Sequence, residues 1–365
     1  RHIAQDPRSA VRIPDAFARA LNAPRAPQGK DPIVTKPRVA VIGTGGTISS
    51  VGRHSLDLVR YIENNKVYEV DELLNAFPET LEQADLVPVR LKAIPSTAIG
   101  PVDWLAINAK VNQVIDDDPS IDGIVITHGT ATLEETAYFL NLVAHVDVPI
   151  VLVGAQRPAS GMGTDAGINL VNAIRAAGHP ESRGRGVLGV LNDEIHFSRD
   201  MTKTSTLRQQ TFRSADFGLL GHADWDKVAY YRMPERRRAP DTEFDVRGLD
   251  DLPRVDVSMT YAGSDGAAIE AFQAAGAKGI VVGAMAPGYV TPRELEKLHA
   301  ARESGVTIVH SSRAGSGRVG DVPSRRAPGT VLADNLTPQK ARVLLTVALT
   351  KTDNPVELQR IFDEY

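Results

Sequence analysis

The chain has 365 residues, of which 42% are hydrophobic and 24% are charged, and these proportions are typical of a folded globular protein with room for two domains. Its formal net charge of -4, without a long run of one sign, excludes nucleic acid as the main partner. The lack of cysteine excludes disulfides, thiolate metal sites and cysteine nucleophiles, and it leaves the redox compartment open.

The first part of the chain differs from the rest in composition. Residues 1–37 contain repeated prolines, and we expect them to form an extension with one short helix over 14–21. The chain begins at Arg1 without a Met or an apolar signal core, which favours a processed or shortened form. No stretch approaches the roughly 18 apolar residues of a spanning helix. We therefore expect no membrane partner and a soluble protein of the periplasm or the cytoplasm.

From Arg38 onward, short Val- and Ile-rich runs alternate with segments of helical periodicity. This alternation predicts an α/β fold, in which mostly parallel strands are joined by crossover helices. The predicted strands are 38–43, 87–93, 123–127, 150–154 and 187–191. The predicted helices are 70–76, 101–116, 133–143 and 166–177. The helix at 133–143 is the clearest, and we expect Glu134 and Glu135 to favour its start.

A change of composition divides the rest of the chain. A basic, proline-bearing stretch at 233–240 is followed by an acidic one at 241–251, which predicts a linker over 233–253. We expect a larger N-terminal catalytic domain at 38–232 and a smaller C-terminal α/β domain at 254–365. In the second domain, strands are predicted at 255–261, 279–283 and 307–311, and helices at 265–275, 293–304 and 338–349.

Two glycine-rich loops follow predicted strands and carry threonines. Gly43-Thr-Gly-Gly-Thr47 follows the first strand, and His128-Gly-Thr130 follows the third. Ligands of open α/β sheets bind at the carboxyl ends of strands, so both loops are candidates for the site. A dinucleotide-binding loop would need glycine where Ile48 stands, which excludes that function. By itself, such a loop is more often only a tight turn.

A third stretch, Asp200-Met-Thr-Lys203-Thr204, adds a lysine. A threonine hydroxyl is a weak nucleophile until a neighbouring base takes its proton. Thr47 and Thr130 are therefore two nucleophile candidates, and Lys203 is a candidate base. Together they indicate an enzyme.

Five motifs occur in a fixed order along the chain. They are Thr-Gly-Gly-Thr-Ile, Ile-Thr-His-Gly-Thr-x-Thr-Leu-Glu-Glu-Thr-Ala-Tyr-Phe-Leu, Val-Gly-Ala-Gln-Arg-Pro, Ser-Arg-Asp-Met-Thr-Lys-Thr and Leu-Thr-Pro-Gln-Lys-Ala-Arg. From about Arg38 to the C-terminus the chain thereby resembles the bacterial type II asparaginase/glutaminase family. The resemblance implies hydrolysis of the side-chain amide of a small molecule without metal or cofactor. It also implies a homotetramer built from close dimers.

The resemblance also implies roles for single residues. Thr47 is similar in position to the nucleophile, Tyr61 to the lid tyrosine that activates it, and Thr130 with Lys203 to the proton relay. The positions implied around the substrate are Gly46, Ser96, Thr97, Gly129, Ala131 and Ala155. Ser96 corresponds to the residue that binds the α-carboxylate. Thr47 would attack the amide carbonyl, backbone amides would stabilise the oxyanion, and water would resolve the acyl-enzyme.

Several positions depart from the family pattern. Where the family has an aspartate that binds the substrate's α-ammonium, this chain has Ala131, and its loss should lower the pKa of Lys203. Thr97 stands in place of a glutamine. In the family, an asparagine and a glutamate of the C-terminal domain lie near the ammonium. The matching regions of this chain are 283–288 and 315–321, where Asp321 is the one acidic residue that could replace them. Burial of an ammonium without anionic partners is costly.

We therefore predict an asparaginase-like amidohydrolase whose substrate differs from L-asparagine or is broader. One alternative is a genuine L-asparaginase/glutaminase that recruits Asp57 or Asp321. Two others are an esterase or lactonase on the same fold, and a binding protein that has lost the chemistry.

Other polar residues have simpler explanations. We expect a structural hydrogen bond at His128, because His54 and His196 share no metal-ligand spacing with it. Asp193-Glu194 fits a turn that faces solvent. Ser311-Ser312-Arg313 fits packing of the C-terminal domain.

Overall fold

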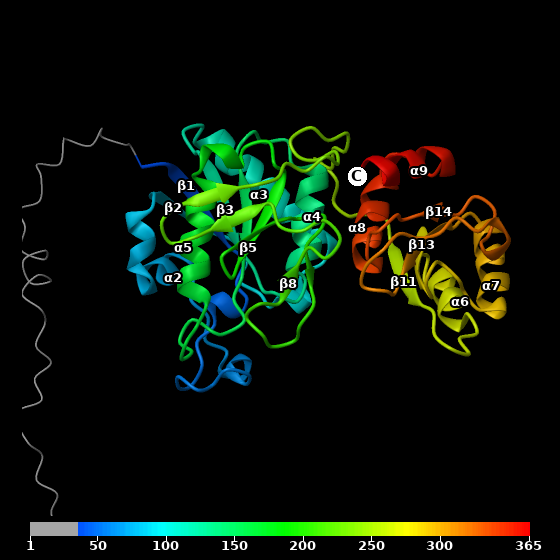
Figure 1. Cartoon of the computed structure of the whole chain (residues 1–365), viewed down its shortest axis with the longest axis horizontal. Coiled ribbons are helices and arrows are strands. Elements are labelled where there is room, and N and C mark those ends of the chain that lie inside the picture. The colour runs from blue at the N-terminus through cyan, green and yellow to red at the C-terminus, as the bar shows by residue number, and fades with distance from the viewer. Residues whose placement is uncertain (1–35) are drawn as a thin grey trace, which may run out of the picture. The chain divides into compact units, whose positions relative to one another are not determined.

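The computed structural model of the protein describes residues 36–365, without the side chain of Arg325. The predicted helix at 14–21 and nearly all of the predicted extension lie outside the described residues. The described part contains two α/β domains, each with its own sheet (Figure 1). This confirms the predicted fold class. The domain boundaries at 232 and 254 stay predictions.

The N-terminal domain contains an eight-stranded sheet of order β10-β9-β6-β5-β4-β3-β1-β2. Its strands are β1 (Arg38–Gly43), β2 (Asp85–Arg90), β3 (Gly123–Thr127), β4 (Ile150–Val153), β5 (Val187–Leu191), β6 (Glu194–Phe197), β9 (Gly221–Ala223) and β10 (Val228–Tyr230). The first five are parallel, whereas β6, β9 and β10 add an antiparallel edge. A separate ribbon pairs β7 (Thr202–Lys203) with β8 (Phe212–Arg213).

Helices cover both faces of this sheet because alternate residues of each strand point to opposite sides. In β1, Val39 and Val41 pack in one buried cluster, and Ala40 and Ile42 pack in another. The first cluster includes α2 (Val70–Ala76) and α5 (Ala166–Ala177), and the second includes α3 (Pro101–Asp117) and α4 (Leu133–Val143). The short 3-10 helices are η1 (Thr47–Ser49), η2 (Tyr61–Asn64), η3 (Pro78–Glu82), η4 (Ser96–Ala98), η5 (Pro180–Ser182) and η6 (Pro323–Arg325).

The C-terminal domain has a parallel four-stranded sheet of order β11-β12-β13-β14. Its strands are β11 (Val255–Met259), β12 (Gly279–Ala284), β13 (Thr307–Ser312) and β14 (Val331–Leu332). Its helices are α6 (Ala267–Ala274), α7 (Pro292–Glu303), α8 (Pro338–Ala348) and α9 (Pro355–Glu364). Side chains of α6 and α7 pack on Ile280 and Val282, whereas those of α8 share a cluster with Val281.

Helix α4 contacts α8 of the other domain, and their side chains belong to one buried cluster. All residues of α4 except Glu135 are therefore buried, not only those that face the sheet. The sequence predicted the helix correctly but missed the burial of its outer side. Within residues 36–365, none of the helices combines the length and apolar character that a bilayer crossing requires.

Candidate active site

The loop that leaves β1 turns sharply before Thr47. The amide and the hydroxyl of Thr44 both donate to the carbonyl of Thr127, at 3.2 and 2.7 Å, which ties the loop to the end of β3. Gly45 and Gly46 then adopt φ angles of 89° and 90°, which favour glycine. Thr47 follows as the first residue of η1. The glycines of this motif therefore determine where the Thr47 side chain begins.

The two glycine-rich loops touch through their backbones. A Cβ atom placed on Gly46 would lie 2.3 Å from the amide nitrogen of Gly129. A Cβ placed on Gly129 would lie 2.5 Å from the Oγ of Ser96. Only glycines allow this approach, which sets the loop of Thr47 against the loop of Thr130.

Substitution of Gly46 by alanine should destabilise the protein by at least about 2 kcal/mol, because the methyl group meets backbone atoms and the φ angle is unfavourable. Urea unfolding measures this, and kcat should fall as well because the two loops separate. Gly315→Ala is the control, since its Cβ meets no atom within 4 Å. Equal midpoints for the two variants would contradict the close contact.

Thr47 and Tyr61 form the first pair of predicted catalytic residues. The hydroxyl oxygens of the two side chains lie 2.7 Å apart, and either can donate. Tyr61 begins η2 within the lid loop, which we define as residues 51–66. The lid loop is tied down by two bonds, from the amide of Gly52 to the Oγ of Ser160 at 2.8 Å and from the amide of Met162 to the carbonyl of Ser55 at 2.7 Å.

Thr130 and Lys203 form the second pair. The Nζ of Lys203 donates to the Oγ1 of Thr130 at 2.7 Å, with Thr130 buried and Lys203 half-buried. Burial lowers the pKa of Lys203, and the carboxylate of Glu134 opposes this. The direction is the one expected from the sequence, but its first cause is burial rather than a missing carboxylate. A lowered pKa increases the neutral fraction that can accept a proton.

Glu134 holds the backbone that carries Lys203. Its carboxylate accepts a hydrogen bond from the hydroxyl of Thr202 and lies 3.5 Å from the amide nitrogen of Lys203. The sequence predicted that Glu134 favours the start of α4. It did not predict that Glu134 also binds the backbone next to Lys203. The apolar residues on the other sides of α4 were the signal that a carboxylate here would be buried.

Two of the predicted substrate-binding residues, Gly129 and Ala131, lie next to Ser96. Its Oγ accepts from the amide of Ala131 at 3.3 Å, and its carbonyl accepts from the hydroxyl of Thr132 at 2.8 Å. Ser96 is buried, whereas Thr97 is exposed. The side chain of Ala155 is fully buried in the cluster behind the sheet, so only its backbone remains for a ligand.

Ala131 is exposed, and both acids that were considered as substitutes for its missing carboxylate have other partners. Asp57 accepts from the amide of Arg53 at 3.1 Å inside the lid loop. Asp321 pairs with Arg326 at 2.9 Å. In this structure Asp57 is thus held within the lid loop, and Asp321 is paired with an arginine.

His128 has the structural role that was predicted. Its Nδ1 donates to the carbonyl of Gly129 at 2.8 Å, because a carbonyl can only accept. The Oγ1 of Thr136 accepts from the indole of Trp104 at 3.0 Å and donates to the Nε2 of His128 at 3.0 Å. Burial lowers the pKa of His128 to about 4, so the ring is neutral. This chain of bonds fixes the carbonyl of Gly129.

The remaining polar candidates also have structural partners. Asp193 accepts from the side-chain amide of Asn172 at 2.8 Å, and Ser311 donates to the carbonyl of Leu336 at 2.6 Å. Among the described residues, no three His, Asp or Glu side chains are grouped closely enough to hold a metal ion.

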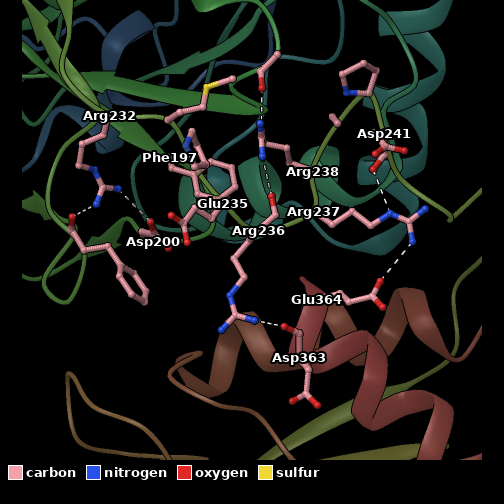
Figure 2. Close-up of a pocket in the computed structure, with 16 residues that line it drawn as sticks. Phe197, Asp200, Arg232, Glu235, Arg236, Arg237, Arg238, Asp241, Asp363 and Glu364 are labelled. Carbon is pink, nitrogen blue, oxygen red and sulfur yellow. Dashed lines mark hydrogen bonds and ion pairs between the residues drawn. The ribbon is translucent and has the colours of Figure 1, made fainter.

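A cavity of about 1190 Å³ lies elsewhere, between residues 232–241 and the end of α9 (Figure 2). None of the predicted catalytic residues lines it. Its arginines already have partners: Arg236 pairs with Asp334 at 2.6 Å, and Arg237 pairs with Glu243 at 2.8 Å. We therefore keep the glycine loops as the candidate active site.

Comparisons with known proteins agree along nearly the whole described chain. Residues 38–236 match the family model "Asparaginase, N-terminal", and residues 254–362 match "Glutaminase/Asparaginase C-terminal domain". A glutaminase-asparaginase of Pseudomonas fluorescens is 38% identical over 97% of this chain and 98% of its own length. L-asparaginase 2 of Bacillus subtilis is 37% identical over 90% of this chain and 87% of its own.

A solved structure supports the same assignment. The crystal structure of a probable cytoplasmic L-asparaginase from Campylobacter jejuni superposes with a TM-score of 0.86 at 36% identity, covering 90% of this chain and all of that one. The fold and these relatives thus define a two-domain α/β hydrolase that acts on carbon–nitrogen bonds. The chain belongs to the asparaginase and glutaminase-asparaginase family of amidohydrolases.

Proposed function

We propose that the chain hydrolyses the side-chain amide of a small carboxylate-bearing substrate and releases ammonia, with Thr47 as the nucleophile. The contact of 2.7 Å between the hydroxyls of Thr47 and Tyr61 is the observation that supports this most directly. The names of the relatives make L-asparagine and L-glutamine the first substrates to examine.

In this mechanism the hydroxyl of Tyr61 relays a proton: it accepts the proton of Thr47 as the Oγ1 of Thr47 attacks the amide carbonyl, and it passes its own proton to the amide nitrogen. Backbone amides at the two glycine turns stabilise the oxyanion, and ammonia leaves with a proton. Lys203, in its neutral form, accepts a proton through Thr130 when water attacks the acyl-enzyme, and the proton returns to the Oγ1 of Thr47 as this oxygen leaves the acyl carbon. Ser96 and the loop of Gly129 hold the substrate carboxylate.

Ammonia release from purified protein tests the proposal. We expect release from L-asparagine or L-glutamine, and we include succinamate for comparison. A small ester and a lactone release acid rather than ammonia, so their hydrolysis is followed by titration of that acid. Hydrolysis of the ester or lactone alone would favour the esterase alternative. Lack of turnover combined with a raised melting temperature on addition of one compound would favour a binding protein.

A second candidate concerns specificity, and Ala131 is the observation that favours it. With alanine here, and with Asp57 and Asp321 paired elsewhere, the substrate's α-ammonium loses a carboxylate partner. We propose that the enzyme discriminates weakly between L-asparagine and its des-amino analogue succinamate, or prefers the latter. Strong preference of the wild type for L-asparagine would refute this second candidate and leave the first intact.

Ala131→Asp should shift this preference toward L-asparagine. A hydrogen bond between charged groups contributes about 1.5–3 kcal/mol, which corresponds to a rise of about 10- to 150-fold in the ratio of kcat/KM for L-asparagine over succinamate. Ala131→Asn is the matched control, because it adds the same shape without the charge. An unchanged ratio in the aspartate variant would show that position 131 does not contact the amino group.

We also propose a homotetramer built from close dimers, on the basis of the family resemblance. Light scattering of the purified full chain gives the mass that checks this.

A further inference from the structure

Lys340 is a fully buried lysine that the proposed mechanism does not use. It lies in the first turn of α8, within the motif Leu-Thr-Pro-Gln-Lys-Ala-Arg. A helix N-terminus favours anions over cations, and a buried ammonium is costly unless it is hydrogen-bonded. Helix stability therefore does not explain a lysine at this position.

The ammonium of Lys340 donates to three carbonyl oxygens within one short segment, residues 198–201, between β6 and β7. The acceptors are the carbonyls of Ser198, Arg199 (at 2.8 Å) and Met201. An ammonium has three N–H donors, so each donor has one acceptor. The side chain of Lys340 thus binds segment 198–201 through three hydrogen bonds.

The surroundings of Lys340 act on the pKa of its ammonium in opposite directions. Burial and the nearby guanidinium of Arg199 lower its pKa, which is about 8 when all neighbours are taken together. The carboxylates of Glu134 and Glu135 on α4, and that of Asp200 in the segment, act in the opposite direction. At pH 7 most molecules therefore supply all three donors.

The segment at 198–201 leads directly into Lys203, and the C-terminal domain holds it by further bonds. Arg199 donates to the main-chain oxygen of Tyr365 and, at 3.0 Å, to the side-chain oxygen of Asn335. A contact within the N-terminal domain adds to these bonds, because Asp200 lies 4.0 Å from Arg232 at the edge of the cavity in Figure 2. The backbone before the relay lysine is thus fixed from the other domain.

We propose that Lys340 is a positioning residue, which holds segment 198–201 so that the amine of Lys203 stays within hydrogen-bond distance of Thr130. This inference rests on the proposed function, because it requires Lys203 in the proton relay. A shift of about 1 Å at a catalytic group can cost on the order of 10²-fold in rate. The C-terminal domain therefore contributes to the chemical step through the shape of this segment.

Steady-state kinetics of Lys340→Met, with the amide that the wild type turns over best, test the inference. We expect kcat to fall about 10- to 100-fold, KM to stay within about twofold, and the acidic limb of the pH–rate profile to move, because the surroundings of Lys203 change. Lys351→Met is the matched control, since that lysine is exposed and pairs with Glu243. It should keep wild-type kinetics at a temperature well below the melting point of either variant.

Aminoethylation of a cysteine at position 340 can restore the amine. It also tests the inference if Lys340→Met does not fold. In Lys340→Cys the new thiol is unique, because the chain has no cysteine. Alkylation with 2-bromoethylamine in denaturant, followed by refolding, restores an amine at nearly the original position. Most of the wild-type kcat should return, while wild type treated in the same way should not change.

Three outcomes would overturn the inference: a folded Lys340→Met protein with wild-type kcat, a rise in KM alone, or no rescue in fully alkylated Lys340→Cys. Lys203→Met, measured in parallel, separates this from a failure of the proposed function. Wild-type kcat in Lys203→Met would remove the relay and the inference with it. An inactive Lys203→Met beside a fully active Lys340→Met would remove the inference alone.

Discussion

Replacement of Thr47 by alanine should lower amide hydrolysis by at least about 10⁴-fold, because a nucleophile that is removed cannot be replaced by its partners. Thr47→Ser should keep a substantial part of kcat, since the hydroxyl next to Tyr61 remains. Ammonia release under saturating substrate measures both. The side chain of Thr47 is only partly buried, so we expect little change in the melting temperature of either variant.

Trapping of the acyl-enzyme distinguishes the two threonine candidates. Acid quench followed by peptide mass analysis should find the adduct on the peptide that contains Thr47. Thr130→Ala should still form this adduct, because Thr130 belongs to the pair with Lys203. An adduct on Thr130, or activity in Thr47→Ala near that of the wild type, would contradict the assignment.

Lys203→Met should lower kcat by about 10²- to 10⁴-fold, the range that one general base contributes. The base acts in its neutral form, so the wild-type rate should rise with pH through the pKa of Lys203. Burial lowers that pKa, which places the rise below the range of an exposed lysine. The pH–rate profile of Lys203→Met should not show this rise.

The unique-thiol approach sharpens this second test. In Lys203→Cys, aminoethylation should restore activity, and the acidic limb should lie at lower pH than in the wild type, because the thioether makes the amine less basic. If the acidic limb lies at the same pH as in the wild type, a group other than residue 203 controls the rate in this pH range. Arg213→Met is a control for charge removal on the same ribbon, since β8 pairs with β7 and the Arg213 side chain is exposed.

The parallel core of the fold was predictable because its strands are buried on both faces and its helices are amphipathic. Strands β1, β3 and β5, and helices α2, α4 and α5, have the predicted bounds. The short antiparallel strands at 194–230 and helix α9 were missed. Strands of two to four residues are too short for a hydrophobic period, and their pairing depends on neighbours that are distant in sequence.

The pairs at the candidate site were partly predictable. The positions of Thr47 and Thr130 came from glycine-rich loops at strand ends, and that of Lys203 came from the family resemblance of the stretch at 200–204. The structure gives Thr47 and Lys203 hydrogen-bond partners. Glu134 and Lys340 were missed as neighbours of Lys203, because both contacts join segments more than 60 residues apart. Such contacts follow from tertiary packing, which no local pattern reports.

The burial of α4 by α8 has a consequence for how the molecule can be divided. Neither domain encloses its apolar residues alone, since the same cluster runs from the large sheet through both helices to the small one. A protein fragment that ends at the linker would expose a large apolar surface to water, and we expect it to aggregate. We therefore expect the two domains to fold and unfold together as one cooperative unit.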